Sequence, residues 1–251
     1  MLPQILFLCR VNEGESATIL TMNKRHLADN ITKLLERVRS SSQKSRNGNN
    51  DILVLAVSKT RDANEIGNAH ACGLSDFGEN YLQEALEKIE ALANLDLTWH
   101  FIGPLQSNKT RAVAEQFHWV HTVDREKIAR RLNDQRPEHL PPLRVCLQVN
   151  ISAESSKSGI SLEDLPALAD AVATMPRLAL RGLMAIPAAT NDEQQQRVAF
   201  SSLREALNAL RVKYPDMDTL SMGMSADLEA AIAEGSTIVR IGTAIFGPRN
   251  R

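Results

Sequence analysis

Eight short apolar runs alternate with helical stretches along this sequence, and no other feature constrains the fold as strongly. The runs lie at residues 51–60, 74–77, 97–103, 119–123, 143–151, 178–186, 219–222 and 237–241. The helical stretches between them lie at residues 63–70, 81–92, 107–116, 125–134, 162–174, 192–213 and 226–233. Parallel strands need such crossovers, so the alternation predicts an α/β protein with a parallel sheet. Eight units favour a closed, TIM-type (β/α)8 barrel over an open doubly wound sheet.

The composition is that of one globular domain without a bulk charge. Of the 251 residues, 43% are hydrophobic and 24% are charged, and the formal net charge is −1. This balance gives no electrostatic reason to expect a nucleic acid or a membrane as partner. No G-x-G-x-x-G sequence follows the first apolar run, which argues against a dinucleotide-binding fold. Because a barrel needs no second copy to complete its pocket, we expect a monomer.

Cysteine and histidine usage indicates a reducing compartment and no metal site. Cys9, Cys72 and Cys146 are far apart, and such a sparse, odd count is typical of a cytoplasmic protein. His118 and His121 lie in an apparent strand, where residues three apart face opposite sides. We therefore predict a cytoplasmic protein without a metal.

The first 21 residues differ from the remainder of the chain. Residues 2–9 are apolar but too short to span a bilayer, and Glu13 and Glu15 follow them instead of a cleavage site. We expect residues 1–21 to be a disordered extension or a mis-assigned start, with Met22 as the true start and the barrel spanning 22–251. From residue 23 to about residue 42, apolar residues recur at helical spacing, namely Leu27, Ile31, Leu34, Leu35 and Val38.

Polar residues gather where the predicted strands end. These ends read SKT, FGEN, HFIGPLQSNK, NIS, MAIP, SMGMS and RIGT. The chemistry of a (β/α)8 barrel collects at the carboxyl-terminal ends of its strands. The Lys, Asn, Ser, Thr and Gly content of these ends suits an anionic, phosphorylated ligand.

Lys59 follows the first apolar run and should sit at the mouth of the barrel. An isolated lysine is normally a solvated surface charge. A lysine at the mouth of a buried strand is partly desolvated, which lowers its pKa and supplies the neutral amine that imine formation requires. Position alone does not say which aldehyde would react.

Two turns near the carboxyl terminus resemble phosphate-binding turns. A serine-rich turn containing Ser225 opens a predicted helix at Ala226, and a glycine-containing turn at Gly242 and Thr243 follows the last strand. The loops after strands seven and eight commonly form the phosphate site of such barrels. Taken alone, Ser225 is better explained as an ordinary helix N-cap, and the two adjacent turns together favour a phosphate site.

Several long segments together resemble a known family. They are LAVSKT, FGENY, WHFIGPLQSNK, SSKSGI, RGLMAIP, LSMGMSADLEAAI and VRIGTAIFG, in this order over residues 51–247. They resemble the pyridoxal phosphate homeostasis proteins, the YggS/PROSC group, and more distantly the barrel domain of alanine racemases. The resemblance implies that pyridoxal 5′-phosphate (PLP) forms a Schiff base with Lys59. It also implies that Ser225, Gly242 and Thr243 hold the phosphate and that Arg240 meets the pyridine nitrogen.

An arginine at the pyridine nitrogen would make the cofactor a weak electron sink, because arginine can only donate hydrogen bonds. Racemases of the similar fold take a second base from an additional carboxyl-terminal domain, whereas this sequence ends at Arg251. We therefore expect a PLP carrier that takes part in vitamin B6 homeostasis and has no strong catalytic activity. Apo PLP-dependent enzymes would be the recipients. The alternatives are a PLP-dependent racemase or decarboxylase, and a cofactor-free aldolase that uses the same lysine.

Five other residues are candidates of lower weight. Residues 103–110, GPLQSNKT, nearly match a nucleotide-binding P-loop, but Asn108 replaces its second glycine, so we expect Asn108 and Lys109 to line the mouth or cap a helix. Lys157 is a loop charge or a second, transient PLP site. Asn80 is predicted to line the cofactor pocket, and His100 either lines it or packs inside a strand.

Overall fold

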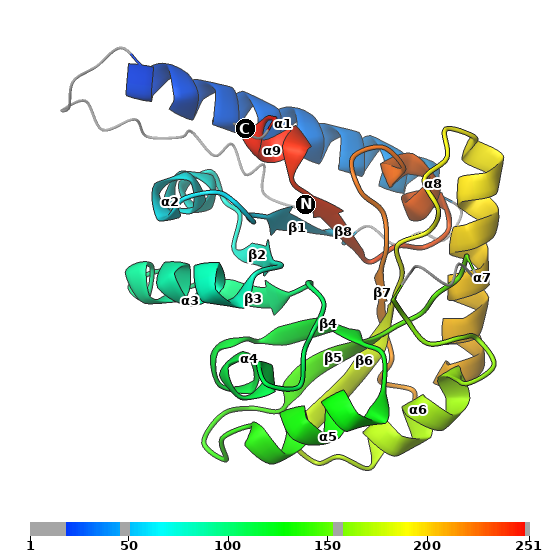
Figure 1. Cartoon of the computed structure of the whole chain (residues 1–251). Coiled ribbons are helices and arrows are strands. Elements are labelled where there is room, and N and C mark those ends of the chain that lie inside the picture. Colours follow the sequence, from blue (N-terminus) through cyan, green and yellow to red (C-terminus); the bar gives the residue numbers. More distant parts are fainter. Residues whose placement is uncertain (1–18, 46–50, 153–157, 249–251) are drawn as a thin grey trace, which may run out of the picture.

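The computed structural model describes residues 19–45, 51–152 and 158–248, which contain a closed barrel of eight parallel strands (Figure 1). The strands are β1 (Leu53–Val57), β2 (Asp76–Glu79), β3 (Thr98–Phe101), β4 (Trp119–Val123), β5 (Leu143–Gln148), β6 (Leu178–Met184), β7 (Thr219–Ser221) and β8 (Ile238–Ile241). They follow one another in chain order, and β8 closes the barrel by pairing with β1. The predicted (β/α)8 barrel is therefore confirmed.

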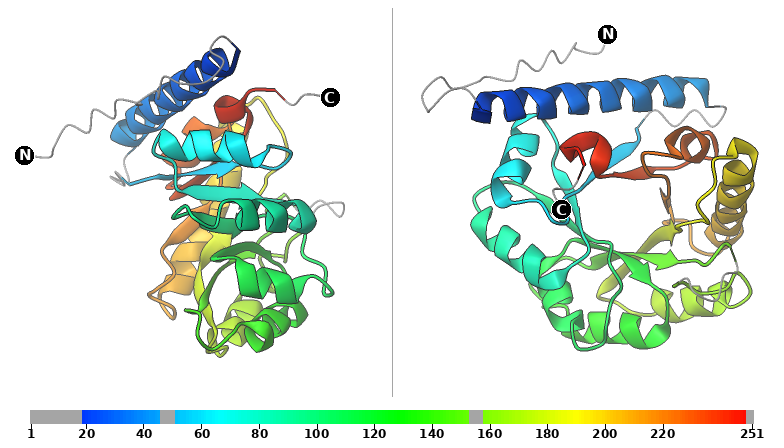
Figure 2. Two further views of the ribbon diagram at one scale, coloured as in Figure 1. Left: turned by 90° about the vertical axis from the view of Figure 1, so that its left-hand side faces the viewer. Right: turned by 45° about the horizontal axis from the view of Figure 1, so that its top comes forward.

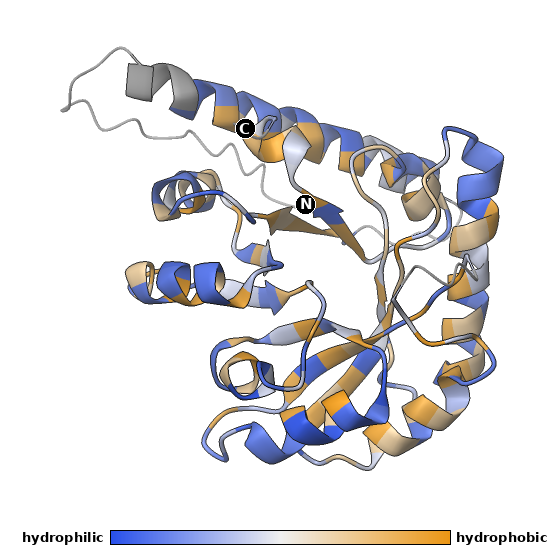
Figure 3. Cartoon of the chain, viewed as in Figure 1, coloured by the Kyte–Doolittle hydropathy of each residue, from blue (hydrophilic) through white to orange (hydrophobic). Residues whose placement is uncertain are grey.

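Helices surround the strands, as the right-hand view of Figure 2 shows. They are α1 (Ile19–Lys44), α2 (Ala63–Ala71), α3 (Leu82–Ala91), α4 (Thr110–Gln116), α5 (Glu126–Gln135), α6 (Leu165–Ala173), α7 (Glu193–Arg211), α8 (Leu228–Ala233) and α9 (Thr243–Phe246). Figure 3 shows both hydropathy colours on these helices, as expected when one side packs on the sheet and the other faces water. No helix in the described ranges is long and apolar enough to cross a membrane.

Some helices begin a few residues away from their predicted positions. α8 begins at Leu228, two residues later than predicted, because residues 225–227 form a turn. The short helix α9 was not predicted. α1 begins at Ile19, three residues before Met22. Residues 1–18 lie outside the described residues, so the prediction about the start of the chain stays a prediction.

α1 covers one side of the barrel and contacts α2, α8 and α9. Four of its five predicted apolar positions are buried, and they are Leu27, Ile31, Leu34 and Val38. The fifth, Leu35, is 43% exposed, because its position falls outside the stripe that faces the barrel.

The barrel interior contains an apolar cluster separate from the main core, which lies between strands and helices. In this interior cluster Leu55 packs with Ile102 and Ile238, and Leu53 and Val57 pack against them. Successive strand residues point to opposite faces, so the odd-numbered positions of β1 face inward. Lys59 continues that phase two residues beyond Val57, which places it over the carboxyl-terminal mouth of the barrel.

Candidate functional site

Lys59 lies in the turn after β1 and is half-buried. It lines a small pocket of about 30 Å³ together with Val57, Arg61, Gly242 and Thr243. The neighbourhood follows from strand pairing, because Ala56 of β1 is in register with Ile241 of β8, and both turns begin just beyond this pair. The structure thus brings three of the predicted site residues together: Lys59, Gly242 and Thr243.

Beside the Lys59 turn lies a polar group of side chains that we call the mouth cluster, formed by Ser58, Glu79, Glu84 and Lys88. Ser58 Oγ donates to Glu79 Oε1 at 2.6 Å. Lys88 Nζ donates to Glu79 Oε1 and to the Ser58 carbonyl, each at 2.8 Å, and to Glu84 Oε1 at 2.5 Å. The same Glu84 oxygen accepts the backbone N–H of Thr60 at 2.5 Å. The residues on both sides of Lys59 are therefore anchored.

Three members of the mouth cluster, Ser58, Glu79 and Lys88, are buried, whereas the Glu84 side chain is 30% exposed. Glu79 is 0% exposed and Lys88 is 5% exposed. Burial raises the pKa of the Glu79 carboxyl, although the charge and hydrogen bond of Lys88 act in the opposite direction. Thr60 has a positive φ of 65°, which is unusual for a β-branched residue and indicates a tightly constrained turn. The cluster holds this turn in place and so limits where the Lys59 amine can be.

Sequence reasoning missed the mouth cluster. Glu84 and Lys88 are four residues apart on α3, a spacing that normally indicates a solvent-exposed helix pair. Glu79 at the end of β2 was noted only as part of a polar strand end. Nothing in the sequence shows that Lys88 reaches a buried carboxylate on the neighbouring strand.

Arg240 lies inside the barrel on β8, in register with Leu55, and is only 5% exposed. Its Nη1 donates to Ser221 O at 2.5 Å and to Ser221 Oγ at 2.9 Å, and its Nη2 donates to Ala185 O at 2.9 Å. Burial lowers the pKa of Arg240 to about 10, so the guanidinium stays charged at neutral pH. These bonds account for three of the five N–H groups of a guanidinium, which leaves it able to donate to a ligand.

Ser225 lies in the turn between β7 and α8 and is half-buried. The N-cap of α8 is Asp227, so the alternative interpretation of Ser225 as a helix cap is wrong. Asp227 Oδ1 instead accepts the Met224 N–H at 2.6 Å, within the turn. From α1, Arg37 Nη1 donates to Ser225 O at 3.1 Å and its guanidinium also binds the Glu229 carboxylate.

α1 also binds α9, the helix that begins at Thr243, because Asn30 Nδ2 donates to Ile245 O at 3.1 Å. Both loops that the sequence assigns to phosphate are therefore held from outside by the same helix. This role of α1 was not predicted, since its contacts join residues 188 and 215 positions apart.

Asn80 follows β2 and is half-buried, and its Oδ1 atom is buried without a hydrogen-bond partner among the described residues. The backbone of Asn80 packs closely against Gly103. A Cβ atom at Gly103 would lie 2.1 Å from Asn80 O, so only glycine allows the loops after β2 and β3 to approach this closely. An orphaned polar atom next to such packing is what a ligand-binding site leaves when no ligand is present.

Four candidates of lower weight remain. Lys109 is exposed at the N-cap position of α4 and its side chain makes no capping hydrogen bond, and Asn108 is exposed beside it. His100 is the packed strand residue of the two alternatives, since it is 0% exposed inside the barrel. Lys157 lies outside the described residues, so its role stays a prediction. His118 is exposed in the bend before β4, one residue outside the strand predicted to contain it, whereas His121 of β4 is fully buried.

Comparisons with known proteins agree over nearly the whole chain. The family model of the alanine racemase N-terminal domain matches residues 23–250. A pyridoxal phosphate homeostasis protein of Pseudomonas aeruginosa is 60% identical over 224 residues, which are 89% of this chain and 96% of that protein. Its counterpart of the same name in Escherichia coli is 52% identical over 227 residues, 89% of this chain and 97% of that protein.

Among solved structures, the chain is similar to PipY of Synechococcus elongatus with PLP bound. The two are 34% identical with a TM-score of 0.77, and the match covers 88% of this chain and all of PipY. The match thus extends over the whole of PipY and shows that the two proteins share the fold.

Proposed function

Because the chain belongs to the family of pyridoxal phosphate homeostasis proteins, we propose that it binds PLP through Lys59 and takes part in PLP homeostasis in the cell. The observation that carries this proposal is the pocket that joins Lys59 to the turn of Gly242 and Thr243. An amine and a turn suited to phosphate are the two groups that a phosphorylated aldehyde needs. When bound, the cofactor supplies an aldehyde that condenses with an amine.

The residues present fit this cofactor. We assign Lys59 to the aldehyde, and Ser225, Gly242 and Thr243 to the phosphate. Arg240 has N–H groups left for a ring acceptor, and Asn80 offers a buried polar atom without a partner. The mouth cluster restrains the lysine, and α1 restrains the two turns. The chain's own residues therefore bind and orient the cofactor.

We further propose that the protein carries PLP and has little catalytic activity of its own. The support is the buried Arg240, which remains a hydrogen-bond donor at neutral pH and would keep a ring nitrogen unprotonated. An unprotonated ring withdraws electrons weakly, so carbanion chemistry would be slow. A PLP-dependent racemase or decarboxylase is the alternative. Recipient apo-enzymes would take the cofactor when one of their own lysines displaces Lys59.

Borohydride reduction followed by peptide mapping tests the binding proposal. The purified protein is loaded with PLP, reduced and digested, and the modified lysine is identified by mass spectrometry. We expect the label on Lys59, and no label there in Lys59→Ala. Lys109→Ala is the matched control, because Lys109 is exposed on the same side of the barrel, and it should label like wild type.

Three results would count against these proposals. Labelling that survives in Lys59→Ala at the wild-type level would remove Lys59 from the site. A purified protein with no visible cofactor absorption would leave the cofactor-free aldolase as the better explanation. Steady turnover of an amino acid, lost in Lys59→Ala, would favour the enzyme over the carrier.

A further inference from the structure

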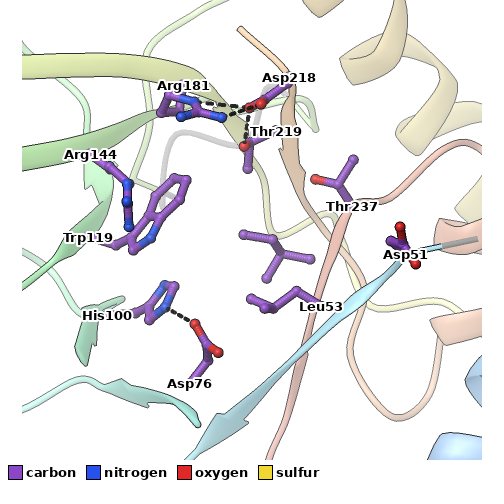
Figure 4. Close-up of a pocket in the computed structure, with 11 residues that line it drawn as sticks. Asp51, Leu53, Asp76, His100, Trp119, Arg144, Arg181, Asp218, Thr219 and Thr237 are labelled. Carbon is purple, nitrogen blue, oxygen red and sulfur yellow. Dashed lines mark hydrogen bonds and ion pairs between the residues drawn. The ribbon is translucent and has the colours of Figure 1, made fainter. Parts of the chain in front are cut away.

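A second cavity of about 480 Å³ lies at the opposite end of the barrel, where the strands begin (Figure 4). We call it the amino-terminal cavity. Its charged and aromatic lining includes Asp76, His100, Trp119, Arg144, Arg181 and Asp218. Arg181 and Asp218 form an ion pair there, and Asp76 binds His100. None of these residues is used by the cofactor site proposed above.

A continuous chain of hydrogen bonds runs from this cavity into the barrel as far as Arg240. Asp76 Oδ1 lies 3.0 Å from His100 Nε2, and His100 Nδ1 lies 2.9 Å from His121 Nε2. His121 Nδ1 lies 2.8 Å from Ser221 Oγ, which accepts from Arg240 Nη1 at 2.9 Å. We call these five residues the barrel chain. Its links come from strands β2, β3, β4, β7 and β8.

All four bonds are satisfied by one arrangement of hydrogens. Arg240 donates to Ser221, so the Ser221 hydroxyl hydrogen is free to point at His121 Nδ1. His121 must then carry its hydrogen on Nε2 and donate to His100 Nδ1, and His100 donates from its own Nε2 to the Asp76 carboxylate. Both imidazoles are neutral in this arrangement. Burial lowers the pKa of His100 and brings that of His121 well below its usual value, which agrees with neutral rings.

The two ends of the barrel chain, Asp76 and Arg240, carry opposite charges and do not contact each other. Within the described part of the molecule, Arg240 has no hydrogen bond to a carboxylate, and only the more distant charge of Asp227 favours its protonated form among the carboxylates. A buried cation without a counter-charge is costly. At the other end burial raises the pKa of Asp76, but hydrogen bonds from His100 and Ser75 and the nearby charge of Arg144 lower it by more, so the carboxylate stays ionised. The chain is therefore polarised in one direction from cation to anion.

We propose that the barrel chain orients Arg240 toward the cofactor and stabilises its charge, so that Asp76, His100, His121 and Ser221 are positioning residues. This role presupposes that PLP binds at the mouth as proposed above. A fixed acceptor at Ser221 determines which way the guanidinium plane lies, and hence where its remaining N–H groups point. His100 is three hydrogen bonds away from Arg240, so its effect on the cofactor would travel only through the barrel chain.

Histidine tautomers in the cofactor-free protein test the chain without any cofactor. In ¹⁵N-labelled protein, the imidazole nitrogens of His100 and His121 report which nitrogen carries the hydrogen, and His100→Asn assigns the His100 signals. We expect both residues to be neutral with the hydrogen on Nε2 between about pH 6 and pH 8. A hydrogen on Nδ1, or a charged ring at pH 7, in either residue would overturn the proposal.

A matched pair of variants tests the effect on the cofactor. His100→Leu removes the acceptor for His121, whereas His100→Asn, of similar size, keeps an acceptor near the position of Nδ1. We expect His100→Leu to shift the absorption maximum of bound PLP and to weaken binding roughly tenfold, and His100→Asn to recover most of both. Trp119→Phe is the control, since Trp119 stacks on His100 at a centroid distance of 5.6 Å and lies outside the chain.

The outcomes separate this inference from the proposed function. If wild-type protein does not bind PLP at Lys59, the proposed function fails, and the tautomer measurement still decides whether the chain exists. If wild type binds PLP and His100→Leu is unchanged in spectrum and affinity, the positioning role fails alone. Equal changes in Trp119→Phe and His100→Leu would also overturn it, because packing would then be the cause. The tautomer measurement on wild type covers the case in which His100→Leu does not fold.

Discussion

The two ends of the barrel both bury charged groups, but they balance the charges in different ways. In the mouth cluster, Glu79 and Lys88 are in direct contact at 2.8 Å. In the barrel chain, two neutral imidazoles and a hydroxyl separate the carboxylate of Asp76 from the guanidinium of Arg240.

The position of each group in the barrel explains this difference. Glu79 shares the strand phase of Phe77, which packs between strands and helices, so a long lysine from α3 can reach it. The barrel chain lies inside the ring of strands, and its five members all come from strands. A relay of short polar groups takes the place of the ion pair. The direct Glu79–Lys88 pair restrains the turn that contains Lys59. The relay instead links the orientation of the Arg240 guanidinium to Asp76 at the other end of the barrel.

Removing the lysine of the mouth cluster should have the largest effect. Lys88→Met leaves the Glu79 carboxylate buried without its cation, and we expect the free energy of unfolding to fall by about 3–5 kcal/mol in urea titrations. Adding Glu79→Gln should recover most of the loss, because no uncompensated charge then remains. A single variant that stays within about 1 kcal/mol of wild type would show that the pair is not desolvated as the structure indicates.

The second-largest effect should come from disturbing the close backbone packing at the barrel mouth. Gly103→Ala would place a Cβ atom 2.1 Å from Asn80 O, and we expect a loss of about 1–3 kcal/mol in unfolding free energy together with weaker PLP binding. Gly67→Ala is the matched control. It lies within α2 with no heavy atom within 4 Å of the new Cβ, and it should raise stability by about 0.5–1 kcal/mol. Equal stability of the two variants would contradict the close approach at the mouth.

Buried groups at the two ends of the barrel should change the unfolding free energy with pH in opposite directions. Burial lowers the pKa of His121 below its unfolded value, so the unfolded chain binds more protons, and stability is present above about pH 6.5 and falls as the pH drops below it. His100 acts in the same direction. Burial raises the pKa of Glu79, so its contribution has the opposite sign and is lost as pH rises through its folded-state pKa.

We therefore expect the unfolding free energy to fall from pH 7.5 to pH 5.5 with a slope that is smaller in His121→Asn. Each buried histidine contributes at most about 1.4 kcal/mol per pH unit. Urea midpoints at both pH values measure the difference. Identical slopes in the variant and wild type would mean that His121 has an ordinary pKa.

The smallest effect concerns the helix that holds the mouth from outside. Arg37 is 39% exposed in its ion pair with Glu229, so Arg37→Ala should lower stability by less than about 1 kcal/mol. PLP affinity should nevertheless drop a few-fold, because the turn of Ser225 loses a contact. Arg111→Ala, which removes an exposed pair with Glu115, should leave affinity unchanged. An equal loss of affinity in both variants would exclude a specific role for α1.

The sequence by itself was sufficient to predict the barrel and the position of Lys59 after its first strand. Strand and helix patterns depend on residues close together in the sequence, so they can be recognised from it. The apolar run at 119–123 matches β4 residue for residue. The position of Lys59 after an apolar strand is likewise visible in a few neighbouring residues. Predicted ranges were least accurate at strand ends, where β3 stops at Phe101 although the apolar run continues to residue 103.

Only the tertiary structure decided which polar residues meet. The mouth cluster joins residues 4 to 30 positions apart, and His121 reaches Ser221 across 100 positions. A strand pattern shows which side chains face inward, but the partner of an inward-facing histidine depends on closure of the barrel and on the register between strands. These contacts arise when the ring closes, so no short stretch of sequence contains them.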